Sequence, residues 1–204
     1  MFLRVPISGW RRVLCAVAMA AVPGVALAHQ GVAAAGGFLS GFMHPLAGVD
    51  HLLAMVAVGI WGAFLGAPLI YLLPVTFPLM MVVGAILGIA GIDLPLIEAG
   101  VALSVVALGA AIAGAWRAPV ALAVAIVAFF AVFHGFAHGK ELPDAADPAA
   151  YAAGFVLATG GLHLCGIALG LVRRLSFGAP LLRGAGVLIA ALGIWILLSR
   201  VSPA

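Results

Sequence analysis

Long apolar stretches, almost free of charged residues, run through this sequence and limit what the chain can fold into. Six of them are long enough to cross the hydrocarbon core of a membrane, which takes roughly 20 residues of helix. Only 7% of the 204 residues are charged, whereas a soluble domain carries roughly 25%. So few charges cannot cover a surface in water, and a disordered chain would be polar. We therefore predict an all-α fold, a polytopic helix bundle in a lipid bilayer.

The distribution of charge excludes nucleic acid as a partner. Nine Lys and Arg face six Asp and Glu, but three of the basic residues, Arg4, Arg11 and Arg12, lie at the N-terminus. The other six basic residues only balance the acidic ones, so no basic stripe is left to bind phosphates. The sequence also lacks the Gly-x-x-x-x-Gly-Lys-Ser/Thr loop that binds nucleotides, so we expect no ATP hydrolysis.

The first 28 residues have the order of a secretory signal peptide. Basic residues come first, an apolar run over 13–27 follows, and Ala-Leu-Ala at 26–28 places small residues before a cleavage point. The alternative is an uncleaved first transmembrane helix, for which about 15 apolar residues are few. We expect cleavage of the signal peptide 1–28, which leaves 29–204 as a single transmembrane domain and makes His29 the mature N-terminus.

Pro, Gly and the few charged residues divide the mature chain into seven helical segments. The first, 31–43, is too short to span a bilayer, so we expect an outer half-helix at the interface or a re-entrant segment. Glycine pairs at i, i+4 spacing predict close helix packing at 62/66, 84/88 and 166/170. Six segments are long enough to be transmembrane helices: 47–66, 69–90, 96–115, 119–138, 150–172 and 182–200.

Charge placement predicts the topology of the six spans. With the mature N-terminus outside, the inner loops hold four basic residues and no acidic one: Arg117, Arg173, Arg174 and Arg183. The outer loops hold Asp93, Glu98, Lys140, Glu141, Asp144 and Asp147. This arrangement satisfies the positive-inside rule and places both mature termini outside. We expect Asp93 and Glu98 to cap a helix or to be solvated in a short outer loop.

Histidines in so apolar a chain are informative, because ionisable groups at membrane depth are costly and indicate function. If a helix starts near His44 and Pro45, His44 and His51 share one face, and Gly48 leaves room between their imidazoles. Asp50 lies beside that face. It could ligate a metal or hold the ring N–H of a ligating histidine. A carboxylate placed there by the helix dipole is the simpler alternative.

A second group lies at the outer end of the fourth span. His134 and His138 have the i, i+4 spacing that presents two imidazoles from one helix face. Glu141 shares that face if the helix continues past Gly139. His163 lies deeper, roughly 20 Å along the fifth span at 1.5 Å per residue.

Both groups, and His29 after cleavage, meet at the outer mouth of the predicted bundle. Imidazoles with carboxylates suit divalent transition metals such as Ni²⁺, Co²⁺, Zn²⁺ and Cu²⁺. Taken singly, each histidine could equally be a hydrogen-bonded packing residue, so it is the convergence of the set that predicts a metal site. The candidate metal-binding residues are His29, His44, Asp50, His51, His134, His138, Glu141 and His163.

The segments HPLAGVDHLLAMVAVGIWGA (44–63) and FHGFAHGKE (133–141) resemble the two signature segments of the HupE/UreJ family of bacterial nickel/cobalt permeases. The resemblance covers essentially the whole chain. It implies uptake of Ni²⁺ or Co²⁺ across the inner (cytoplasmic) membrane, often to supply hydrogenase or urease maturation. It also implies that the metal is transported substrate and that no cofactor is needed. The family's motif residues correspond to His44, Asp50, His51, His134, His138 and Glu141.

We therefore expect a membrane permease rather than an enzyme. The ion would lose water to the outer ligands and pass toward His163. The alternative is an intramembrane metal-dependent enzyme, a hydrolase or oxidase, that uses the same cluster with one coordination position open. A bis-histidine haem protein ranks last, because only His163 is clearly deep.

Overall fold

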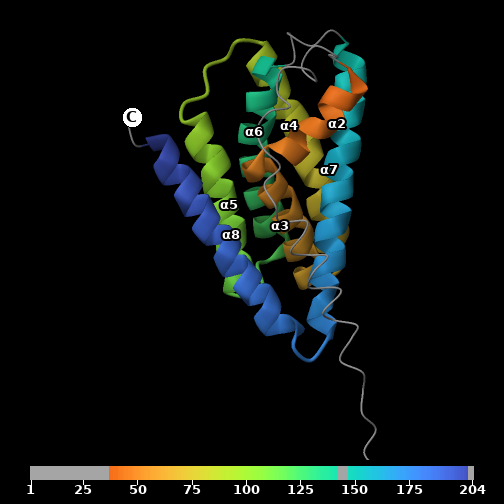
Figure 1. The fold of residues 1–204 in the computed structure, drawn as a ribbon, viewed down its shortest axis with the longest axis vertical. Helices are drawn as coiled ribbons and strands as arrows, with labels where there is room; N and C mark the ends of the chain where they lie inside the picture. Colours follow the sequence, from red (N-terminus) through yellow and green to blue (C-terminus); the bar gives the residue numbers. More distant parts are fainter. Residues whose placement is uncertain (1–36, 142–146, 202–204) are drawn as a thin grey trace, which may run out of the picture. The chain divides into compact units, whose positions relative to one another are not determined.

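The computed structural model describes residues 37–141 and 147–201, so the predicted signal peptide and His29 lie outside the described residues. Within them the fold is all-helical, without strands (Figure 1). The all-α prediction is confirmed. The helices are α2 (Phe38–Ala47), α3 (Val49–Leu65), α4 (Leu69–Ile89), α5 (Ile97–Ala113), α6 (Val120–Glu141), α7 (Pro148–Gly170) and α8 (Gly178–Val201), with a 3-10 turn, η3 (Leu171–Arg174), between α7 and α8.

The described helices make this a multi-pass membrane protein. Four of them, α4, α6, α7 and α8, are long and apolar enough to cross a membrane alone, and α2 with α3 forms a fifth, bent candidate. Helix α5 has 17 residues, about 25 Å at 1.5 Å per residue. Each of the six long predicted segments corresponds to one helix from α3 to α8. The count of six spans stays a prediction.

The helix is interrupted between His44 and His51, where a continuous helix was expected. Helix α2 carries His44 in its last turn, Gly48 is extended (φ −81°, ψ 110°), and α3 departs at 81°. The predicted shared helix face of residues 44, 48 and 51 is therefore wrong. Within the described residues the half-helix is Phe38–Ala47, which ends four residues later than the predicted segment 31–43. Glycine is poor inside a helix, and an Asp50 carboxylate favours a new helix N-terminus.

The helices pack in pairs: α4 with α6, α5 with α8, and α3 with α7, while α2 also lies on α7 (Figure 1). Glycines allow this close approach. A Cβ added at Gly135 of α6 would collide with the backbone of Met81 in α4. The predicted pairs 84/88 and 166/170 do lie in such contacts, against α6 and α3. The pair 62/66 instead ends at the turn into α4, where Gly66 has a φ of +83°.

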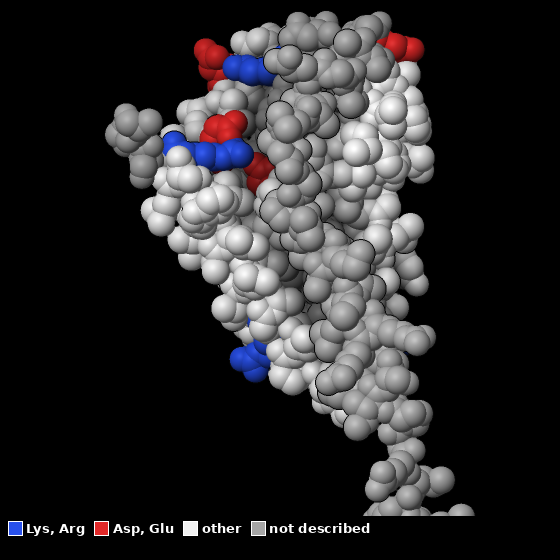
Figure 2. Space-filling view, in the orientation of Figure 1, with Lys and Arg blue, Asp and Glu red and all other residues white. Residues whose placement is uncertain are grey.

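Charged residues lie at the helix ends. Figure 2 shows a largely uncharged face on which the acidic side chains are confined to the upper part. Asp50 and Glu98 are in the first turns of α3 and α5, and Arg200 in the last turn of α8 contacts both. At the opposite end of α5 and α8, Arg183 donates a hydrogen bond to the carbonyl of Ala113. The end with Asp50 and Glu98 is the one that the sequence predicts to face outside.

Candidate metal site

Four histidines from three helices gather near the end that holds Asp50. His44 lies in the last turn of α2 and His51 in the first turn of α3. His134 and His138 lie in the last two turns of α6. Ring centroids are 4.5 Å apart for His51 and His138, 4.8 Å for His51 and His134, and 4.8 Å for His44 and His138. The break at Gly48 therefore brings both motif histidines to the α6 pair.

Three of the four clustered histidines are shielded from solvent, and His44 is half-buried. His134 has no exposed surface, and His51 and His138 are buried. Helix α7 provides an aromatic wall, since the ring of Phe155 lies 4.5 Å from that of His138 and the ring of Tyr151 lies 6.0 Å from that of His44. Burying several imidazoles in a membrane bundle is costly, which favours a functional role for them.

Asp50 fixes the orientation of the His51 ring. Its Oδ1 accepts hydrogen bonds from the backbone N–H of His51 at 2.8 Å and from the ring Nδ1 at 2.7 Å. A carboxylate can only accept, so Nδ1 carries the proton and Nε2 of a neutral ring keeps its lone pair. That Nε2 is buried and has no hydrogen-bond partner among the described residues. Of the roles considered for Asp50, this geometry fits that of a carboxylate that holds the ring N–H of a histidine.

Ser104 of α5, which the sequence analysis missed, does the same for His134. Its Oγ donates to the carbonyl of Val101 at 2.6 Å and lies 2.8 Å from Nε2 of His134. The hydroxyl has only one hydrogen, so at Nε2 it must accept, and His134 keeps its lone pair on Nδ1. That atom is also buried and without a hydrogen-bond partner in the described part of the chain. Ser104 is the one polar side chain in α5 beyond Glu98 of the first turn, and that was the available signal.

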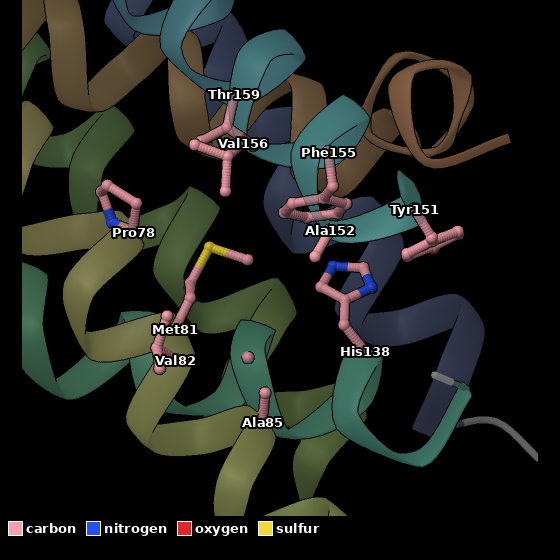
Figure 3. A pocket seen from close by; sticks show the side chains of 11 residues that line it. Pro78, Met81, Val82, Ala85, His138, Tyr151, Ala152, Phe155, Val156 and Thr159 are labelled. Atoms are coloured by element: carbon pink, nitrogen blue, oxygen red, sulfur yellow. The ribbon is translucent and has the colours of Figure 1, made fainter. Parts of the chain in front are cut away.

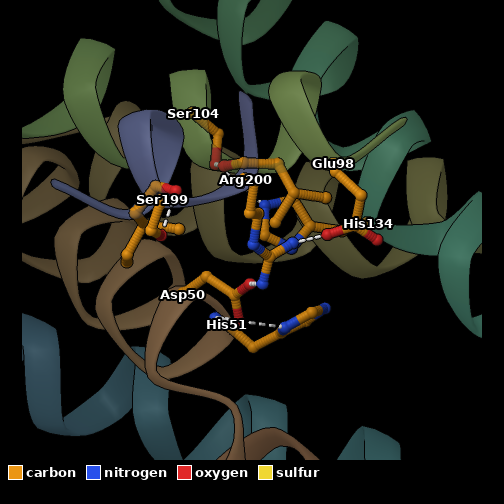
Figure 4. A network of polar contacts seen from close by, with 9 residues as sticks. Asp50, His51, Glu98, Ser104, His134, Ser199 and Arg200 are labelled. Atoms are coloured by element: carbon orange, nitrogen blue, oxygen red, sulfur yellow. Dashed lines mark hydrogen bonds and ion pairs between the residues drawn. The ribbon is translucent and has the colours of Figure 1, made fainter. Parts of the chain in front are cut away.

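Arg200 links two carboxylates at the edge of the cluster (Figure 4). Its Nη2 lies 2.7 Å from Oδ2 of Asp50, and its Nη1 forms an ion pair with the Glu98 carboxylate. Glu98 was expected to cap a helix or to be solvated. It lies in the first turn of α5 and is largely exposed, and the structure adds an ion pair with Arg200. Sequence reasoning missed Arg200, because 150 residues separate it from Asp50.

His163 lies apart from the four clustered imidazoles. Its ring is 5.5 Å from that of Phe77 in α4, and the Phe77 ring is also 5.3 Å from that of His134. The fully buried Phe77 ring therefore contacts both the cluster and His163. The Nε2 of His163 and the hydroxyl of Thr159, one turn earlier in α7, are buried without hydrogen-bond partners in the described residues.

Two predicted ligands cannot be placed. His29 and the side chain of Glu141 lie outside what the structure describes. The α6 backbone does continue past Gly139 to Glu141, which was the condition for Glu141 to share a face with His134.

The nitrogen atoms of the clustered rings do not point at one common position. Among the described side chains, no three His, Cys, Asp or Glu are arranged to hold a single ion. The His51–His134 and His44–His138 pairs meet edge to face. Ligation of a shared ion therefore requires the rings to turn, and the unpartnered Nε2 of His51 and Nδ1 of His134 are available for it.

An apolar pocket of about 110 Å³ borders the cluster between α4, α6 and α7. Figure 3 shows His138 at its edge, with the sulfur of Met81 and the ring of Phe155 on its walls. Its only lining residues with polar side-chain atoms are His138, Tyr151 and Thr159. This lining suits hydrocarbon rather than an ion.

Fold and site together define a class, a multi-pass membrane protein with a buried histidine cluster near one end of its bundle. The model of the HupE / UreJ protein family matches residues 17–196, and the chain belongs to that family of nickel/cobalt permeases. One relative, protein HupE of Rhizobium leguminosarum bv. viciae, is 40% identical over 188 residues, which cover 92% of this chain and 98% of the relative. No solved structure matches the chain.

Membership of the family confirms the resemblance seen in the two motifs. The family consists of metal transporters, so the prediction that the chain is not an enzyme is confirmed. The intramembrane hydrolase or oxidase considered as an alternative is therefore set aside.

Proposed function

We propose that this protein is a permease that takes up Ni²⁺, or Co²⁺, through the histidine cluster of α2, α3 and α6. The observation that carries the proposal is the gathering of four imidazoles from three helices beside one oriented carboxylate. The proposed ligands are His44, His51, His134 and His138, with Asp50 orienting the His51 ring. His29 and Glu141 are further ligands at the mouth, and His163 is the next position inward.

The donor set supports a divalent transition metal. Neutral imidazole nitrogens suit Ni²⁺ and Co²⁺. Cys165, the one cysteine left after cleavage of the signal peptide, is exposed, which argues against a metal site built from sulfur ligands. The carboxylates at this end attract a cation, and the imidazoles replace part of its water. A conduction path also needs binding weak enough for release, and rings that must turn to converge fit that need.

Passage inward requires a movement at Phe77. Its ring contacts those of both His134 and His163, so we expect it to move when an ion passes from one to the other. Beyond it, Nε2 of His163 and Oγ1 of Thr159 offer two buried polar atoms without hydrogen-bond partners in the described chain. We assign this pair to the second position of the path.

We place the protein in the bacterial inner membrane, with the cluster on the periplasmic side. The supporting facts are the signal-peptide pattern over 1–28 and the Arg residues at the end opposite Asp50, which the positive-inside rule assigns to the cytoplasm. Both mature termini are then periplasmic. The imported nickel would supply hydrogenase or urease maturation, as the family resemblance implies.

The test is ⁶³Ni²⁺ accumulation by cells that express the parent or the variants His44→Ala and His134→Ala at equal membrane abundance. Cys165→Ala, an exposed position on α7, is the matched control and should transport like the parent. Uptake that both histidine substitutions abolish supports the proposal. Unchanged uptake in both histidine variants would rule out this site. No uptake of Ni²⁺ or Co²⁺ by the parent would overturn the proposed function.

A further inference from the structure

We propose that Arg200 is a tethered cation that competes with the transported ion for Asp50, and that Glu98 is the carboxylate to which Arg200 moves when the ion binds. The inference rests on the proposed function and deepens it, since it assigns the control of ion affinity to two residues outside the histidine cluster.

The first step is the geometry around Asp50. Its Oδ1 is taken up by His51, and its Oδ2 by Arg200 at 2.7 Å. The guanidinium thus neutralises the carboxylate that orients His51. A divalent ion on Nε2 of His51 would bring a second positive charge to the same Asp50–His51 unit. Two cations that interact with the same pair of residues repel each other strongly where water is scarce. The bound ion therefore weakens the Arg200–Asp50 ion pair, and that ion pair weakens ion binding.

The second step is the unequal burial of the two carboxylates. The Asp50 side chain is 7% exposed, whereas that of Glu98 is 65% exposed. A buried carboxylate without a counter-charge is costly, which explains why Arg200 lies on Asp50. Once an ion compensates Asp50, that cost disappears and Glu98 can keep the guanidinium in partly hydrated surroundings.

The third step is the freedom of Arg200 to move. It lies in the last turn of α8 with 35% of its side chain exposed, and its two nitrogens already touch one carboxylate each. A shift onto Glu98 therefore breaks one contact and keeps the other. In our proposal, the ion pair with Glu98 keeps the Arg200 guanidinium near the mouth while the ion occupies the cluster.

The experiment measures Ni²⁺ binding to the purified full-length protein in detergent by calorimetry. Arg200→Gln should tighten binding about tenfold, the size of coupling between neighbouring charged groups, and should lower both KM and maximal rate of uptake because release slows. Glu98→Gln should weaken binding several-fold, since Arg200 then remains on Asp50. Arg200→Lys retains the charge and should stay close to the parent.

Arg183→Gln, near the other end of α8, is the matched control and should bind like the parent. Shifts of opposite sign for Arg200→Gln and Glu98→Gln support the inference. Shifts of the same sign, or none, overturn it. If Arg200→Gln does not give folded protein, Glu98→Gln decides alone, because equal or tighter binding contradicts the competition. A parent that binds no Ni²⁺ overturns the proposed function, whereas a parent that binds it without these shifts overturns only the role of Arg200.

Discussion

The ring Nδ1 of His51 donates a hydrogen bond to the Asp50 carboxylate at 2.7 Å, between neighbours in the sequence that open helix α3. This bond places the ring proton on Nδ1 and leaves Nε2 with a free lone pair. Asp50→Asn keeps the shape but can present an amide N–H to Nδ1, which would move the ring proton to Nε2. We expect Ni²⁺ affinity to fall about 10- to 100-fold, as for other carboxylates that orient a metal-binding histidine. Calorimetry on the purified protein measures it, and unchanged affinity would contradict the orienting role.

Ser104→Ala tests the corresponding support of His134. The change removes the acceptor of the Nε2 proton and leaves a buried N–H unpaired, which costs about 1–3 kcal/mol. We expect weaker Ni²⁺ binding by about tenfold and a lower melting temperature. Ser199→Ala is the matched control, because that hydroxyl bonds only to the carbonyl of Ile196 in its own helix. Equal effects of the two substitutions would show that Ser104 has no special role.

His163→Ala should separate binding from transport. The four clustered imidazoles remain in place, so Ni²⁺ affinity measured by calorimetry should stay near that of the parent. The rate of ⁶³Ni²⁺ uptake at saturating metal should fall at least tenfold, because the ion loses the position beyond Phe77. Parent-like uptake would remove His163 from the path, and a matching loss of affinity would place it in the outer site.

Gly135→Ala should prevent correct packing of α6 on α4. The added Cβ would meet the backbone of Met81, which cannot move aside as a flexible side chain can. We expect little folded protein in the membrane, read as monodisperse material after detergent extraction. Gly160→Ala is the control, because an added Cβ there meets nothing within 4 Å and alanine favours helix by about 1 kcal/mol. Equal yields of the two variants would contradict the packing account.

The helices were predictable because one local property, apolar length bounded by Pro, Gly and charge, decides where a membrane helix lies. The break at Gly48 was not. Residues 44–51 fit a continuous helix by spacing. Gly48 and Asp50 permit a break there, and the contacts of His44 with α6 and α7 favour two helices at 81°. Tertiary contact overrode local pattern there.

The histidines of the site were predictable because imidazoles are rare and costly in an apolar chain. Their partners were not, since Ser104 and Arg200 come from α5 and α8, helices that carry no histidine motif. The sequence gives no spacing that links them to His134 or Asp50. The packing of α5 against α6 and of α8 against α3 brings them to the cluster.

The central claim is that imidazoles of α2, α3 and α6 hold the transported ion together. X-ray absorption at the nickel edge of the Ni²⁺-loaded, full-length protein tests it most directly, because imidazole rings give a distinct multiple-scattering signal. We predict several imidazole ligands, fewer in His51→Ala and in His138→Ala. A spectrum of oxygen ligands alone, the same in the parent and in both variants, would contradict the account.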